Sequence, residues 1–181
     1  MTVDNNAVQS ADIHAGENMG HLAGKYLTFK LGSEEYGINI ANVREINVMM
    51  DIDALPNIPP YIKGVINLRG KIIPIIDLRL KFGIPPADYT KETCIIVIDV
   101  DNFMMGIVVD TVSEVMDMEG SDIDPAPRFG SAIHTEFILG LGKTKDGIKI
   151  LLDIKKVFGE NEFEKVEEIY QEVEVEELLE A

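Results

Sequence analysis

The sequence predicts an all-β fold made of two small barrels, and three observations support that prediction. Between residues 26 and 159 the apolar stretches are short and are separated by Gly, Pro, Asp and Asn, which is typical of short strands joined by tight turns. The same stretch contains an internal repeat. With 181 residues, 46% of them hydrophobic, the chain is long enough to bury a core without disulfides or metals.

The repeat consists of two displaced copies of one pattern, which we place at residues 26–83 and 92–159. The displacement is constant through the first part of the pattern, and it grows once, after a short insertion in the second copy. Before the insertion, the matched pairs are Tyr36-Gly37-Ile38 with Met105-Gly106-Ile107, Val43-Arg44-Glu45-Ile46 with Val112-Ser113-Glu114-Val115, and Pro56 with Pro125; after it, they are Gly64 with Gly140 and Asp77 with Asp153. The whole region 25–159 is therefore expected to be one duplicated domain.

Each repeat contains five short apolar stretches in the same order, and each stretch is expected to be a strand. The turns are expected at Gly32-Ser33-Glu34, Arg69-Gly70, Asp101-Asn102 and Asp146-Gly147, and the strands around them at residues 26–31, 65–68, 72–76, 95–100 and 148–152. Five short strands favour a closed barrel, because closure removes exposed edges. Units this small bury little core alone, so we expect the barrels to pack together and to exchange their first strands, with a groove between them.

The two ends of the chain differ from the repeats in composition. Residues 1–24 are polar, with isolated apolar residues at no steady period, and are expected to form a disordered tail. Residues 160–181 contain ten Glu and one Lys, with apolar residues spaced three or four apart, and are expected to form an acidic amphipathic helix.

Charge and composition exclude several functions. The net charge of −16, from 32 acidic and 16 basic residues, argues against nucleic acid as a partner, which needs a basic stripe. No apolar run approaches the ~20 residues that span a bilayer, and no secretory signal is recognisable, so we expect a cytoplasmic protein with no direct membrane insertion. We find no set of nucleophile, base and orienting residue and no metal-ligand spacing, and so expect no enzyme, no cofactor and no metal site.

Several segments together resemble the CheW family of bacterial chemotaxis proteins. They are Ile62-Lys63-Gly64-Val65-Ile66-Asn67-Leu68-Arg69-Gly70, Pro74-Ile75-Ile76-Asp77-Leu78, Gly106-Ile107-Val108-Val109-Asp110, Pro125-Ala126-Pro127 and Phe137-Ile138-Leu139-Gly140-Leu141-Gly142. The resemblance covers both repeats and neither tail. It implies two intertwined five-stranded barrels of SH3-like or OB-like character, and a non-enzymatic adaptor that couples chemoreceptors (methyl-accepting chemotaxis proteins) to the histidine kinase CheA.

The resemblance also implies partner-binding residues by position: Ile40, Val43, Glu45, Arg69, Val112, Val115 and Phe129. In the family, the tip of a receptor docks in the groove between the subdomains, and each subdomain can meet a complementary one in the regulatory domain of CheA. The chain would then be recruited to membrane receptor arrays and be monomeric when free. For the four aliphatic residues, a place in the core is an equally open interpretation.

Two alternatives remain open at this point. A CheW-like scaffold of another chemosensory pathway would have the same sequence pattern. A ligand-binding or enzymatic double barrel would instead need a deep polar pocket with convergent, desolvated carboxylates, where we expect a shallow apolar groove.

Overall fold

The computed structural model describes residues 19–126 and 136–158, together with scattered positions between 164 and 179. The elements in these ranges are η1 (Gly20–Leu22), β1 (Gly24–Leu31), β2 (Glu34–Asn39), η2 (Ile40–Asn42), β3 (Val43–Val48), β4 (Ile62–Leu68), β5 (Lys71–Asp77), α2 (Leu78–Lys81), β6 (Cys94–Val100), β7 (Phe103–Val109), β8 (Thr111–Met118), η3 (Gly120–Asp122), β9 (Ile123–Pro125), β10 (Ile138–Thr144), β11 (Gly147–Leu152) and α3 (Ile154–Val157). The described part of the chain is therefore mostly β-sheet, as the sequence predicts.

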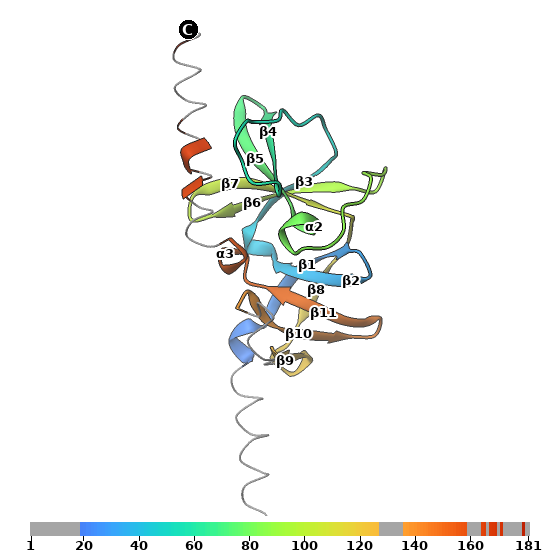
Figure 1. The fold of residues 1–181 in the computed structure, drawn as a ribbon. Helices are drawn as coiled ribbons and strands as arrows, with labels where there is room; N and C mark the ends of the chain where they lie inside the picture. Colours follow the sequence, from blue (N-terminus) through green and yellow to red (C-terminus); the bar gives the residue numbers. More distant parts are fainter. Residues whose placement is uncertain are drawn as a thin grey trace, which may run out of the picture.

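The strands form two sheets, which lie one above the other in Figure 1. The lower sheet has the order β8-β1-β2-β11-β10-β9, and the upper sheet has the order β3-β6-β7-β5-β4. Two neighbouring pairs, β2–β11 and β5–β7, are parallel, and the other named pairs are antiparallel. Each sheet takes strands from both halves of the sequence, so neither half holds all the strands of a sheet.

The repeat found in the sequence also relates the strands. The hairpin β4–β5 of the first copy corresponds to β10–β11 of the second, and its register shift between Ile62 and Gly64 recurs between Ile138 and Gly140. The parallel pairs correspond in the same way, since Ile75 faces Gly106 and Leu151 faces Gly37. Asp77 and Asp153 each cap the short helix that follows: the Asp77 side chain accepts from the amides of Arg79 and Leu80, and the Asp153 side chain accepts from the amide of Lys155.

The two sheets share one hydrophobic core. Phe29 and Ile38 of the lower sheet and Ile96 and Ile107 of the upper sheet are fully buried in a single cluster. Each sheet also has a smaller cluster of its own, around Tyr26 and Leu151 below and around Ile73 and Val97 above. Burying one such side chain stabilises the fold by about 1.5–3 kcal/mol, so the shared cluster holds the sheets in a fixed arrangement.

Residues just before the first strand contact the lower sheet. Met19 and Leu22 pack against the lower cluster, and the Tyr26 hydroxyl donates a hydrogen bond of 2.6 Å to the carbonyl oxygen of Leu22. Two apolar residues before the first strand gave no periodic signal, because they contact the sheet through a 3-10 turn.

The expected acidic helix falls mostly outside the described residues. The described positions among residues 164–171 are helical, and Glu167 and Glu168 are exposed there. Ile169 is 4% exposed and belongs to the shared cluster. The chain beyond the second repeat thus contributes at least one side chain to the core.

Candidate partner-binding site

Glu45 and Arg69, two of the predicted contact residues, form an ion pair on the upper sheet. Nη2 of Arg69 donates to Oε2 of Glu45 at 2.5 Å, and Nδ2 of Asn47 donates to Oε1 at 2.9 Å. Arg69 begins the turn between β4 and β5 with a left-handed backbone, φ 53°, and is followed by Gly70 at φ 87°. The Arg69 side chain is 71% exposed, so the pair presents unused guanidinium donors at the surface.

The carboxylate of Glu45 is stabilised in its charged form. Hydrogen bonds from Asn47 and from Arg69 lower the pKa of Glu45 below the ordinary glutamate value. Because the pKa of Glu45 is lowered in the folded state, the pairing of its carboxylate stabilises the fold at pH values above the ordinary glutamate pKa. That stabilisation is lost as the pH falls through the lower pKa of the folded state. The pair is therefore intact at neutral pH.

We predict that replacing Arg69 with alanine raises the pKa of Glu45 back toward its ordinary value, because one of the two hydrogen-bond donors is lost. The measurement is an NMR pH titration of the Glu45 side-chain carboxyl in both proteins. Glu35, which pairs with lysines instead, serves as the internal control and should titrate identically in both. An unchanged Glu45 titration would show that the pair does not persist in solution.

The predicted aliphatic contact residues divide into two kinds. Ile40, Val43 and Val112 are half-buried and pack against the shared cluster, so part of each side chain belongs to the core, and their contact role remains a prediction. Val115 is 49% exposed and lies on β8, the end strand of the lower sheet. Of the four predicted aliphatic contact residues, Val115 is the one whose side chain is exposed rather than half-buried.

The backbone beside Val115 is fixed by a buried threonine. The pairing of β1 with β8 shifts between Leu27 and Phe29, which interrupts the regular hydrogen bonds. There the Thr28 hydroxyl donates to the carbonyl oxygen of Glu114 at 2.8 Å and lies 3.2 Å from its amide nitrogen. Thr28 is fully buried, so Val115 is held on a rigid strand.

The structure adds two apolar residues that the sequence prediction missed. Ile46 and Val48 on β3, the end strand of the upper sheet, are 44% and 72% exposed. Ile46 is matched with Val115 in the repeat, so the repeat itself held the signal that could have found it. We call Glu45, Ile46, Val48 and Arg69 the β3 strip, and Glu114 and Val115 the β8 strip.

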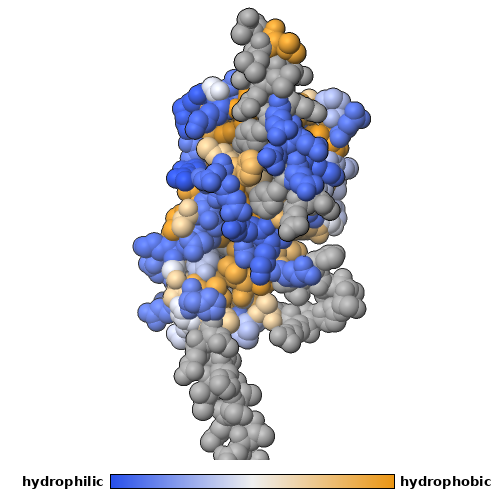
Figure 2. Space-filling model, turned by 90° about the vertical axis from the view of Figure 1, so that its left-hand side faces the viewer, coloured by the Kyte–Doolittle hydropathy of each residue, from blue (hydrophilic) through white to orange (hydrophobic). Residues whose placement is uncertain are grey.

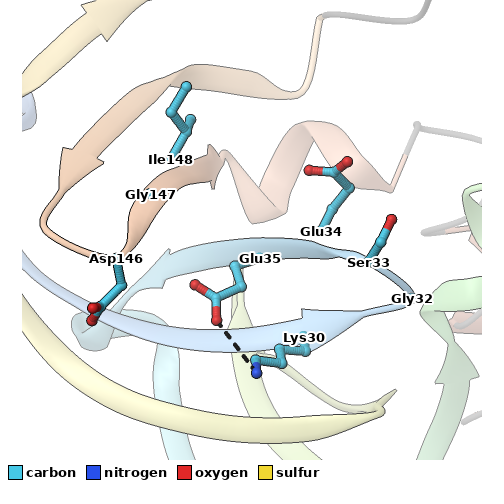
Figure 3. A pocket seen from close by; sticks show the side chains of 8 residues that line it. All are labelled: Lys30, Gly32, Ser33, Glu34, Glu35, Asp146, Gly147 and Ile148. Atoms are coloured by element: carbon cyan, nitrogen blue, oxygen red, sulfur yellow. Dashed lines mark ion pairs between the residues drawn. The ribbon is translucent and has the colours of Figure 1, made fainter.

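The hollow that the structure describes lies away from both strips. It is open, has a volume of about 650 Å³ and is formed by the β1–β2 and β10–β11 turns (Figure 3). Its lining residues are Lys30, Gly32, Ser33, Glu34, Glu35, Asp146, Gly147 and Ile148. Glu35 is paired there with Lys30 and with the buried Lys149, whose pKa is lowered by burial and, secondarily, by Lys30.

This hollow does not have the features of a catalytic pocket. It is open to solvent, and its most buried carboxylate is neutralised by two lysines rather than held against another acid. Within residues 19–126 and 136–158, no three His, Cys, Asp or Glu side chains are grouped so as to hold a metal ion. Apolar side chains on the face in Figure 2 form areas interrupted by hydrophilic ones. The shallow apolar groove between the barrels remains a prediction.

Phe129 lies outside the described residues, so its predicted contact role remains a prediction. Among the helices that the structure describes, none has the length and apolar character needed to cross a membrane.

The described part of the chain is an all-β domain with exposed aliphatic and charged residues on the end strands of both sheets, a surface that suits a scaffold or adaptor, and the comparisons point to the same class. Residues 25–162 match the family described as CheW-like domain. The chain is 42% identical over 155 residues to the chemotaxis protein CheW of Klebsiella aerogenes, covering 86% of this chain and 92% of the relative. It is 34% identical over 146 residues to that of Treponema pallidum, covering 77% and 85%.

A solved structure is also similar. The scaffolding protein TtCheW of Thermoanaerobacter tengcongensis superposes with a TM-score of 0.71 at 36% identity, covering 77% of this chain and 95% of that one. The chain therefore belongs to the CheW family. It is a chemotaxis scaffold protein and not an enzyme.

Proposed function

We propose that this chain couples chemoreceptors to the histidine kinase CheA in the cytoplasm and is recruited with them to membrane receptor arrays. The observation that carries the proposal is the pair of exposed strips on rigid end strands, one per sheet. A protein with two separate contact surfaces can hold two partners at once without any chemistry of its own. A scaffold of another chemosensory pathway would use the same geometry, and identifying the bound receptor distinguishes the two.

We further propose that each sheet closes as an SH3-like barrel and that the two barrels arose by duplication with exchanged first strands. Two features support closure. Asp53 and Val65 exchange two backbone hydrogen bonds of 2.9 Å, which bring the segment after β3 back to β4. In the lower sheet, the end strands β8 and β9 are joined directly through η3.

The chemistry of the strips indicates how each would bind. Along β3, Ile46 and Val48 alternate with Glu45, so the two aliphatic side chains face one side of the strand and the Glu45–Arg69 pair faces the other. The β3 strip therefore offers an apolar contact on one side and a charged, hydrogen-bonding contact on the other. The β8 strip has one exposed valine beside an acidic residue. We propose that both strips face a receptor tip or the kinase regulatory domain, and Phe129 remains a proposed kinase contact.

We predict that Arg69→Ala weakens partner binding while leaving thermal melting nearly unchanged, because a 71% exposed side chain adds little to folding. Binding is measured by calorimetry with a receptor-tip fragment and, separately, with the CheA regulatory domain. Lys143→Ala removes a comparably exposed surface pair, with Asp124, on the other sheet and serves as the control. Equal affinities for Arg69→Ala and the unsubstituted protein toward both partners would contradict the assignment.

A further inference from the structure

A partly buried ion pair, which the strips do not use, lies where the two sheets join. Arg79 belongs to α2, which follows β5 of the upper sheet, and Asp110 lies between β7 of the upper sheet and β8 of the lower sheet. Nε and Nη2 of Arg79 donate to the two carboxylate oxygens of Asp110, each at 2.7 Å. The side chains are only 18% and 29% exposed, so solvent and salt screen this two-pronged contact less than a surface pair.

The same two residues tie down two further backbone segments, one at the β1–β2 turn and one after α2. The Gly32 amide in the β1–β2 turn donates to Oδ2 of Asp110 at 2.8 Å, and the Asp110 amide donates to the carbonyl oxygen of Lys30 at 3.0 Å. Nη1 of Arg79 donates to the carbonyl oxygen of Pro85 at 2.7 Å. Burial by itself would raise the pKa of Asp110, but hydrogen bonds from Arg79 and Gly32 hold it below its ordinary value. The pair therefore stays charged at neutral pH.

The related junction on the opposite side is much weaker. In the repeat, Lys155 of α3 is the counterpart of Arg79, and Asp101 of the β6–β7 turn is the counterpart of Gly32. Lys155 and Asp101 form a single contact of 2.8 Å between side chains that are 60% and 56% exposed. Ala41 occupies the position that matches Asp110 in the repeat, so no carboxylate at that position bridges this junction. An exposed single-point pair of this kind contributes little rigidity.

We infer that Arg79 and Asp110 are positioning residues, which together latch the start of β8 to α2 and so fix the β8 strip relative to the β3 strip. Asp110 directly precedes Thr111, the first residue of β8, and the strand carries Val115 outward from that point. Losing the latch would let β8 shift while the shared core keeps both sheets folded. The expected effect on binding rests on the proposed function, whereas the expected change in the position of β8 does not.

The geometric test needs no partner. Spin labels are attached at Val48→Cys and Asp117→Cys, exposed positions on the two end strands, in a Cys94→Ala background. Electron paramagnetic resonance then gives the distribution of distances between the labels. We expect a single narrow distribution with the native pair and a distinctly broader or shifted one with Asp110→Asn. Lys155→Met, the matched control at the weaker junction, should leave the distribution unchanged.

The binding test uses unlabelled full-length protein with a receptor-tip fragment, at a temperature where circular dichroism shows every variant folded. Arg79→Met and Asp110→Asn should weaken affinity on the order of tenfold. Arg79→Lys, which keeps the charge but not the two-pronged geometry, should fall between them and the native protein. Lys155→Met should stay within about twofold.

The outcomes separate the two claims. Unchanged label distances in folded Asp110→Asn would overturn the latch, whatever happens to binding. Changed distances with native affinity would overturn its role in positioning the strips. Failure of the unsubstituted protein to bind any receptor fragment would overturn the proposed function, while the distance measurement would still decide the latch.

Discussion

Replacing Val115 with glutamate is expected to weaken binding of a partner by about 2–4 kcal/mol, the loss typical of a central hot-spot residue. The side chain is 49% exposed on a strand held by Thr28, so a carboxylate there meets water in the free protein. Thermal melting should therefore change little. Calorimetric binding to the receptor-tip fragment and to the CheA regulatory domain, with melting of the same sample, measures both effects.

Two matched variants make this experiment decisive. Ile148→Glu places the same charge at another exposed aliphatic position, 57% exposed in the β10–β11 hairpin, and should leave both affinities unchanged. Val43→Glu places it at a half-buried position against the shared core and should destabilise the fold by about 3 kcal/mol or more, because the carboxylate would be desolvated there. If Val115→Glu binds both partners with native affinity, β8 is not part of the binding surface.

Replacing Gly64 with alanine is expected to destabilise the domain by about 2–4 kcal/mol. Gly64 has φ +140°, a conformation that other residues rarely adopt, and its added methyl group would collide with the backbone carbonyl of Asp53. That collision would break the two hydrogen bonds between Asp53 and Val65. Chemical denaturation followed by circular dichroism gives the change in the free energy of unfolding.

The control for this variant is Gly20→Ala, where an added methyl group has no neighbour within 4 Å. It should change the free energy of unfolding by less than about 1 kcal/mol. Gly140→Ala tests the same position in the other hairpin, where the methyl group would lie 2.7 Å from the carbonyl oxygen of Asp124. Equal stability of Gly64→Ala and Gly20→Ala would contradict the close approach of β4 to the segment after β3.

The sequence predicted the all-β class because turn residues and short apolar stretches act locally. Gly32, Asp101 and Gly147 do have positive φ angles at tight turns. The positions of η1 and of Ile169 could not be predicted, since each is ordered by contacts with residues far away in the chain rather than by its own pattern.

The candidate site was predictable only in part, for the same reason. Pairing of Glu45 with Arg69 follows from a contact between β3 and a turn that the sequence does not place side by side. Val112 and Val115 lie three residues apart, so alternation along a strand places them on opposite faces, and the half-buried Val112 and exposed Val115 differ in this way. The prediction treated the two alike because it did not use this spacing. Ile46 was missed although its equivalent in the repeat was chosen, so comparing the two copies position by position would have found it.

Whether one chain holds a receptor and the kinase together is tested most directly in a ternary mixture. Purified chain, a receptor-tip fragment and the CheA regulatory domain are studied by analytical ultracentrifugation, in pairs and all together. We expect the two partners to sediment in one complex only when this chain is present, and we expect that adding one partner does not displace the other. Two separate binary complexes with mutual displacement, or no complex with either partner, would contradict the coupling role.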